Sequence, residues 1–203
     1  DQTKLLIIRG EGKHFCSGFD RDPEAFKSAT SRSLLGVEIE SMLQILAEAP
    51  CITLAHIHGA AVGAGADIAV ACDYRCATAD ASMAFPGFNL MGVSLGNSRL
   101  SQRIGPDQAM KLVLQARRVG AEEALNLGLV TNIIAMEAIE EFFGTVIEGQ
   151  ATDEEYTKLF VQLQKMPHRF AIGGLHQLDG LLRQPHVAEP FLQQLIKGHI
   201  AVK

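Results

Sequence analysis

Short, continuous apolar runs recur through the first two thirds of the chain, and each has the length and composition of a buried β-strand. The clearest are residues 4–9 (KLLIIR) and 51–57 (CITLAHI), each followed by a glycine-bearing turn. Residues 74–78 and 82–85 predict two further strands joined by a turn, and residues 128–131 lead into a last short strand. The chain therefore has the strands needed for a sheet.

Helical patterns separate these strands and follow them. Apolar residues recur at helical spacing between positions 35 and 46, where Asp22 and Pro23 predict the start of the helix and Pro50 its end. Further helices are expected at 68–72, 107–116 and 121–127, and the pattern beyond residue 135 is helical throughout. We therefore predict an α/β protein with a core in residues 1–134 and a helical C-terminal region in residues 135–203.

Composition and charge exclude several classes of function. The formal net charge is −5 and the basic residues are scattered, so nucleic acid is not an expected partner. No apolar stretch approaches the ~20 residues that a transmembrane helix requires, so no membrane association is expected. The four cysteines have the spacing of neither a disulfide framework nor a zinc site. We expect no metal, reduced cysteines and a cytoplasmic protein.

Two segments are rich in glycine and small residues without an obvious packing need. They are residues 15–20 (FCSGFD), after the first strand, and residues 59–67 (GAAVGAGAD), between a strand and a helix. A glycine-rich turn at a helix N-terminus exposes backbone N–H groups that stabilise negative charge. The dinucleotide fingerprint fails because Ile68 occupies its third glycine position, and no Gly-Lys-Ser/Thr of a P-loop follows.

Three segments in order resemble the signatures of the crotonase (enoyl-CoA hydratase/isomerase) superfamily. They are GEGKHFCSGFD (10–20), HGAAVGAGADIAVACDYRCATADASMAFP (58–86) and ALNLGLV (124–130). The resemblance implies the crotonase-like ββα superhelix, whose helical C-terminal region covers the active site and builds a homotrimer or a dimer of trimers. Family members have a further strand and helix before the point where this chain begins, so we expect an N-terminal piece to be missing.

The resemblance also implies an acyl-CoA thioester substrate, with coenzyme A as part of the substrate and no separate cofactor. In that family two backbone N–H groups hold the thioester oxygen, and the motifs assign these groups to Phe19 and Ala64. The same two segments carry the expected contacts with the ligand: Lys13, Ser17, Gly18, Gly63 and Gly65.

The side chains expected to move protons depart from the family pattern. Typical hydratases have two glutamates; Asp67 stands at the first position, and Phe85-Pro86-Gly87 replaces the Pro-Glu segment that carries the second. Asp67 can act in catalysis or can simply favour its helix dipole. Substitutes for the second carboxylate are weaker: Ser94, Asn97, Ser98 and Arg99 are better explained by turn hydrogen bonds. His56 and His58 are better explained as structural histidines with satisfied hydrogen bonds.

Three hypotheses of function remain open on this sequence. The favoured one is an enoyl-CoA hydratase/isomerase-like enzyme of fatty acid metabolism, with Asp67 as proton carrier. The second is other crotonase chemistry, namely thioester hydrolysis, decarboxylation or C–C cleavage. The third is a catalytically silent acyl-CoA-binding subunit, which the missing second glutamate suggests because water addition normally needs both an acid and a base.

Overall fold

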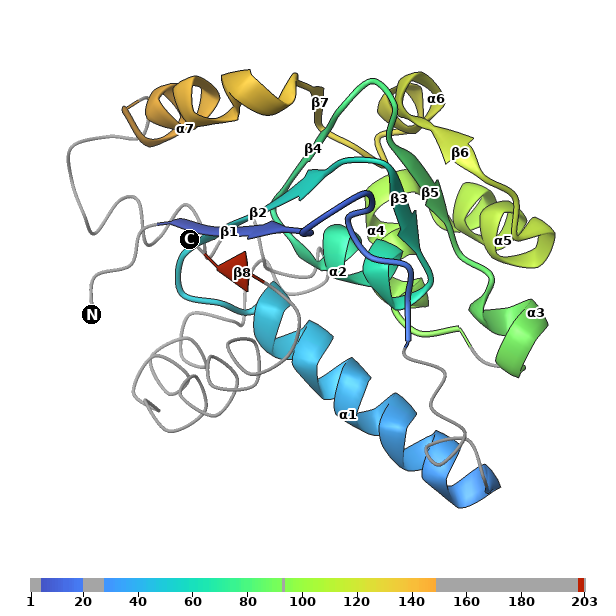
Figure 1. Cartoon of the computed structure of the whole chain (residues 1–203). Coiled ribbons are helices and arrows are strands. Elements are labelled where there is room, and N and C mark those ends of the chain that lie inside the picture. The colour runs from blue at the N-terminus through green and yellow to red at the C-terminus, as the bar shows by residue number, and fades with distance from the viewer. Residues whose placement is uncertain (1–4, 20–27, 93, 149–200, 203) are drawn as a thin grey trace, which may run out of the picture.

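The first sheet supplies the framework of the molecule (Figure 1). The computed structural model describes residues 5–19, 28–92, 94–148 and 201–202. Within these ranges the sheet has the strand order β7-β4-β2-β1-β8. Its strands are β1 (Leu5–Arg9), β2 (Ile52–Ile57), β4 (Tyr74–Ala77), β7 (Asn132–Ile133) and β8 (Ala201–Val202). The first four run parallel, whereas β8 pairs antiparallel with β1.

The central strand β2 explains why its sequence is a continuous apolar run. All six of its residues are buried, because parallel neighbours flank it and other elements cover both of its faces. Strand β1 alternates instead: Leu6 and Ile8 enter the main core, while Leu5 and Ile7 face a second cluster. The sheet therefore has two covered faces.

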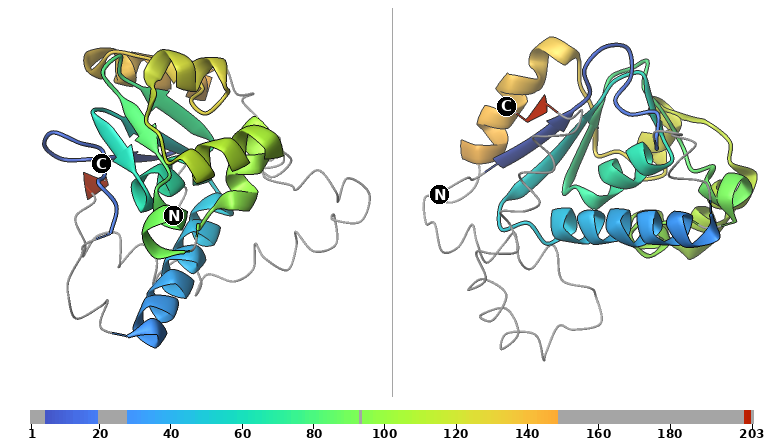
Figure 2. Two further views of the ribbon diagram at one scale, coloured as in Figure 1. Left: turned by 90° about the vertical axis from the view of Figure 1, so that its right-hand side faces the viewer. Right: turned by 60° about the horizontal axis from the view of Figure 1, so that its bottom comes forward.

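A second sheet has the strand order β3-β5-β6 and lies beside the first (Figure 2). Its strands are β3 (Ala60–Val62), β5 (Ser82–Ala84) and β6 (Val119–Gly120), of which β3 and β5 are parallel. A single parallel bridge joins Cys16 to Ala61, so the segment after β1 runs along the free side of β3. This sheet brings the two glycine-rich segments of the sequence together.

Helices cover these sheets. Their bounds are α1 (Ala29–Ala47), α2 (Ala64–Ala71), α3 (Gly87–Met91), α4 (Asn97–Ile104), α5 (Pro106–Gln115), α6 (Ala121–Asn126), the 3₁₀ turn η1 (Met136–Ala138) and α7 (Ile139–Glu148). No helix in the described ranges combines the length and the apolar character needed to cross a membrane.

Helix α2 is the buried centre of the fold. Every one of its residues is buried, and it contacts β2, β3, α1 and α4. Its small side chains permit this packing: a Cβ atom on Gly65 would lie 2.4 Å from the carbonyl oxygen of Cys16. Long side chains would push the neighbouring elements apart, so the small-residue segment of the sequence is a packing requirement as well as a turn.

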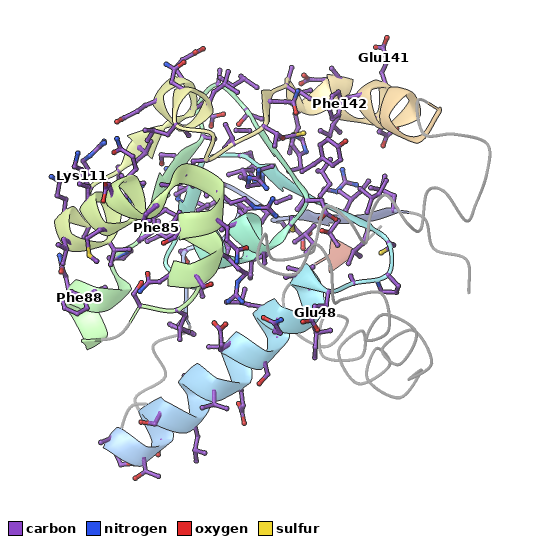
Figure 3. The ribbon with its side chains drawn as sticks, turned by 180° about the vertical axis from the view of Figure 1, so that it is seen from behind. Glu48, Phe85, Phe88, Lys111, Glu141 and Phe142 are labelled. Carbon is purple, nitrogen blue, oxygen red and sulfur yellow. The ribbon has the colours of Figure 1, made fainter. Side chains whose placement is uncertain are left out.

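Helix α7 covers the other face of the first sheet. Phe142 points toward the sheet and Glu141 away from it (Figure 3). The ring of Phe142 meets that of Tyr74 edge to face, with centroids 6.4 Å apart. Leu54, Cys76 and Ile139 form the buried centre of this smaller cluster. This contact attaches the beginning of the C-terminal region to the core.

Several sequence predictions of element bounds were wrong. The N-cap of α1 is Ser28, whose hydroxyl accepts a hydrogen bond from the N–H of Ser31 at 3.0 Å, and not Asp22. Helix α2 begins at Ala64 rather than at residue 68, after the short strand β3. Gly92 ends α3 and Gly96 precedes α4, both with a φ of 70°.

The C-terminal region was predicted to be entirely helical, which is wrong at its end. Residues 201–202 form β8, which pairs with residues 8 and 9 and so satisfies the edge of β1. The predicted helices between residues 149 and 200 lie outside the described residues, as do Asp22 and Pro23.

Candidate active site

Two turns that are distant in the sequence meet beside β3. The N–H of Cys16 donates to the carbonyl oxygen of Ala60 at 3.1 Å, and the N–H of Val62 donates to that of Cys16 at 2.9 Å. Gly18 follows with a φ of 101°, and a Cβ atom there would lie 3.0 Å from the carbonyl oxygen of Val62. A larger residue at 18 would therefore be strained and crowded. The structure thus brings the predicted segments 15–19 and 59–67 into direct contact.

The second turn leads directly into α2. Gly63 has a φ of 57°, and its N–H donates to the carbonyl oxygen of Ala84 at 2.9 Å, which ties the turn to β5. Ala64 is the first helical residue, so its N–H lies at the positive end of the helix dipole. In the described part of the chain, no protein group accepts a hydrogen bond from the N–H of Ala64 or of Phe19. Both donors are those predicted for the thioester oxygen.

Asp67 lies one turn further along α2, with its carboxyl group buried. Only 7% of the residue is exposed, and its N–H donates to the carbonyl oxygen of Gly63 at 3.0 Å. Burial raises the pKa of Asp67 to about 8; the nearby Arg99 lowers it and Glu40 raises it further. At neutral pH the carboxyl group is therefore mostly protonated.

The raised pKa of Asp67 can be compared with the gain expected from the helix dipole. A carboxylate in the first turn of a helix gains ~0.3–1 kcal/mol from the dipole. A change in pKa from 3.8 to about 8 favours the neutral form by on the order of 5 kcal/mol. The effect of burial on Asp67 is therefore larger than that of the dipole. A buried carboxyl group with a strongly shifted pKa is a candidate for a catalytic position.

Arg99 and Glu40 connect this carboxyl group to helix α1. One terminal nitrogen of Arg99 (Nη2) lies 2.7 Å from Oε1 and 2.6 Å from Oε2 of Glu40, and Nη1 lies 3.3 Å from Oε1 of Gln44. The Arg99 side chain is 11% exposed and that of Glu40 44%. Sequence analysis missed Glu40, because its proximity depends on the crossing of α1 and α4, which no local pattern reveals.

The remaining candidate residues lie in different surroundings. The hydroxyl of Ser94 lies 2.7 Å from Oδ1 of Asn97, which confirms the expected turn hydrogen bond. Gly87, in the segment expected from the sequence to carry the second glutamate, begins α3. Lys13 and Ser17 are exposed on the first turn. Among the described residues no cluster of His, Cys, Asp or Glu could hold a metal ion.

The prediction that His56 and His58 are structural histidines with satisfied hydrogen bonds was wrong for His56. His56 does face the core and is fully buried, but neither of its ring nitrogens has a hydrogen-bond partner within the described part of the chain. Desolvation, followed by the charges of His58 and Arg9, lowers the pKa of His56 to about 4, so the ring is neutral. His58 is satisfied in part, with Nε2 3.0 Å from the carbonyl oxygen of Gly12.

Comparison with known proteins connects this geometry to one family. The model of the enoyl-CoA hydratase/isomerase family matches residues 1–166. The chain is 35% identical over 131 residues to a "Probable enoyl-CoA hydratase" of Rhodobacter capsulatus, covering 64% of this chain and 51% of that protein. It is 31% identical over 159 residues to the ethylmalonyl-CoA decarboxylase of Mus musculus, covering 73% and 49%. The chain thus spans about half the length of the curated relatives it matches.

The fold is shared with solved structures. An enoyl-CoA hydratase from Thermoplasma volcanium aligns with a TM-score of 0.73 at 23% identity, covering 97% of this chain and 80% of that one. The predicted crotonase-like α/β fold is therefore confirmed. The boundary predicted between residues 134 and 135 stays a prediction.

Proposed function

This chain belongs to the enoyl-CoA hydratase/isomerase family, and on that basis we propose that it is an acyl-CoA enzyme that stabilises a thioester enolate. In this proposal the N–H groups of Phe19 and Ala64 bind the thioester oxygen, and the carboxyl group of Asp67 carries the proton. The observation that carries the proposal is the buried carboxyl group of Asp67, which lies one helical turn from the N–H of Ala64 and whose pKa of about 8 lets it take up and release a proton near neutral pH.

Each group has a defined task in this chemistry. Backbone N–H donors stabilise the oxygen as it becomes negative, and removal of one such donor typically costs ~10²–10³ in rate. The positive end of α2 adds to this field. Asp67 then transfers its proton to carbon: its O–H bond breaks, a C–H bond forms with the electron pair of the enolate, and the thioester carbonyl is restored.

Proton transfer by one carboxyl group is favoured over addition of water. Hydration needs one group to activate water and another to protonate carbon. Gly87 supplies no carboxylate where the family has one, and the carboxylate of Glu40 is engaged by Arg99. We therefore rank isomerisation of an enoyl-CoA, in which one group removes and returns a proton, ahead of hydration.

Decarboxylation is the second candidate, and the protonation of Asp67 favours it. When a carboxylated acyl-CoA loses CO₂, the C–C bond breaks and its electrons form the enolate, which then needs an acid to protonate carbon. A carboxyl group with a pKa of about 8 is such an acid at neutral pH. The likeness to an ethylmalonyl-CoA decarboxylase supports this alternative. The two reactions differ in pH dependence, because isomerisation starts from the carboxylate and decarboxylation from the acid.

Mass spectrometry of products over a panel of 2-enoyl-, 3-enoyl- and 2-carboxyacyl-CoA thioesters tests the proposal. We expect isomerised or decarboxylated product, and a loss of ~10²–10⁴-fold in kcat/KM for Asp67→Asn. Asp107→Asn is the matched control, because Asp107 is also a first-turn aspartate but is exposed on α5. Turnover that is insensitive to Asp67→Asn contradicts the proposal. Thioester binding without turnover supports the alternative of a silent binding subunit.

The ligand contacts and the C-terminal region complete the proposal. Coenzyme A is bound as part of the substrate, with Lys13 and Ser17 beside its phosphates and Gly18, Gly63 and Gly65 keeping the turns open to the thioester. Exposure of the Lys13 and Ser17 side chains supports this assignment. The role expected for residues 135–203, covering the site and building the assembly, stays a prediction.

A homotrimer or a dimer of trimers is the proposed assembly. Exposed apolar side chains on neighbouring helices support it: Phe88 and Leu90 on α3, and Met110 and Leu114 on α5. Figure 3 shows Phe88 of α3 and Lys111 of α5 at the outer side of the molecule. Sedimentation equilibrium of the full chain tests the assembly. We further propose a cytoplasmic enzyme of fatty acid metabolism, in keeping with four cysteines that form no disulfide.

A further inference from the structure

The proposed proton carrier Asp67 has two charged neighbours, Arg99 and Glu40, which lie on two other helices. Asp67 on α2 packs against Gly96, where a Cβ atom would lie 2.9 Å from its Oδ1. Arg99 follows three residues later on α4, and Glu40 reaches Arg99 from α1. These three helices lie side by side in Figures 1 and 2, and α2 contacts both of the others.

The hydrogen bonds around Arg99 are unequal. Glu40 accepts at 2.6 and 2.7 Å, and Gln44 accepts at 3.3 Å, so α1 holds the terminal nitrogens of the guanidinium group. No described residue donates a hydrogen bond to the Asp67 carboxyl group. The Nε–H of Arg99 is buried and has no acceptor within the described part of the chain. The Nε–H of Arg99 is thus available as a donor, while the carboxylate of Glu40 balances the charge of the guanidinium group.

We propose that Glu40 and Arg99 are positioning residues that let Asp67 both hold and release a proton: Glu40 favours the uncharged acid, and Arg99 stabilises the carboxylate. This inference rests on the proposed function, because it assigns Asp67 to proton transfer. Glu40 balances the charge of Arg99, so that Asp67 is not forced into an ion pair. Once Asp67 has lost its proton, Arg99 is the cation beside the new carboxylate. The pair acts through Asp67 and touches no reacting atom.

The other elements around α2 do not supply a competing charge. Strand β3 has no titratable side chain, and β2 has His56, whose pKa of about 4 leaves it uncharged at neutral pH. Burial remains the largest cause of the raised pKa of Asp67, and Arg99 and Glu40 then act on it in opposite directions. Removing either partner should therefore shift the titration of Asp67 in a known direction.

Titration of the Asp67 carboxyl carbon by ¹³C NMR tests the inference in the full chain, with the signal assigned by its loss in Asp67→Asn. We expect Glu40→Gln to lower the midpoint by about 1 pH unit and Arg99→Gln to raise it by a similar amount. Glu38→Gln is the matched control: it removes the same charge from an exposed position on α1 and should leave the midpoint unchanged. An unmoved or raised midpoint in Glu40→Gln overturns the inference; should that variant not fold, an unmoved or lowered midpoint in Arg99→Gln does so.

The pH profile of kcat/KM, measured with the acyl-CoA that the panel identifies, separates this inference from the function on which it rests. We expect the limb that reports Asp67 to move in the same direction as the NMR midpoint in each variant. Shifted midpoints without turnover of any acyl-CoA keep the charge coupling and contradict the proposed function. Turnover that depends on Asp67 but midpoints that do not move keep the proposed function and overturn the coupling.

Discussion

Among the described residues, the carboxyl group of Asp67 has a pKa that lies especially far from its ordinary value. Its pKa is raised from 3.8 to about 8, first by burial, so the folded protein binds a proton there that the unfolded chain has released. The group is therefore a source of instability that grows with pH, as expected where a position is selected for chemistry rather than for stability.

This linkage gives a prediction with a definite sign. Between pH 4 and pH 8 the native state holds more protons at Asp67 than the unfolded state, so the free energy of unfolding should fall as pH rises through this window. Asp67→Asn removes the dependence, and its stability relative to the original chain should therefore increase from pH 5 to pH 8. Urea unfolding at several pH values measures this. A difference that stays constant across the window would show that Asp67 is not protonated in the fold.

Gly96 is the residue that makes room for this carboxyl group. It has a φ of 70°, and a Cβ atom would lie 2.9 Å from Oδ1 of Asp67. Gly96→Ala should therefore cost at least ~1 kcal/mol of unfolding free energy and should also reduce activity. Gly36→Ala on α1 is the control, since nothing lies within 4 Å there and alanine favours a helix. Equal effects of the two substitutions would contradict the crowding at Gly96.

At the scale of elements, α2 is fixed at both of its ends. Its N-terminal turn is tied to β5 through Gly63, while buried Arg75 holds its C-terminal end. Nη1 of Arg75 donates to the carbonyl oxygens of Cys72 at 2.7 Å and Asp73 at 3.1 Å, and its Nε donates to that of Leu129 at 2.9 Å. Ala64 and Asp67 thus lie on a helix with little freedom to move.

Loss of Arg75 should loosen this attachment. Arg75→Met keeps most of the side-chain volume, but it removes the side-chain donor to the buried carbonyl oxygen of Leu129 and leaves that of Cys72 with Arg103, so we expect a loss of ~2–4 kcal/mol in unfolding free energy. The control is Arg118→Met, which removes an exposed arginine whose side chain, among the described residues, donates only to Ser82 at 3.3 Å; it should cost less than ~0.5 kcal/mol. Thermal unfolding of the two variants provides the comparison.

Strand β2 contains a group whose pKa is lowered by burial, in contrast to that of Asp67. His56 is fully buried, and its pKa is lowered to about 4 by desolvation first. Below its ordinary pKa of 6.5 the unfolded chain takes up a proton that the fold does not, so stability should fall as pH falls from 6.5 to 4. His56→Leu should therefore be increasingly stabilised, relative to the original chain, at lower pH. If the difference is the same at pH 7 and at pH 4.5, His56 is not the group responsible.

At the scale of the whole molecule, local patterns predicted the strands better than the helix boundaries. Runs such as residues 51–57 are continuous because both faces of β2 are covered, and that signal is visible in the sequence. Helices α3 and α4 were not predicted, because they are short and glycines stand at their ends. Strand β8 could not be predicted, because two residues gain their strand conformation only by pairing with β1.

The candidate site likewise has residues that the sequence reveals and one that it does not. Phe19, Ala64 and Asp67 lie in motifs whose glycines are visible in the sequence, and the structure brings their segments together. Glu40 carries no such signal, because it reaches the site only through Arg99, 59 positions away in the chain. Contacts made by long side chains across packed helices depend on the tertiary fold, which no local pattern encodes.

The binding of a thioester oxygen by the N–H groups of Phe19 and Ala64 is best tested by infrared spectroscopy. The measurement uses crotonyl-CoA labelled with ¹³C at the thioester carbonyl, bound to the Asp67→Asn variant of the full chain so that turnover is suppressed. Two backbone donors polarise the carbonyl, so its stretching frequency should be lower than that of the free thioester in water. An unchanged frequency in the bound thioester would contradict the proposed oxyanion site.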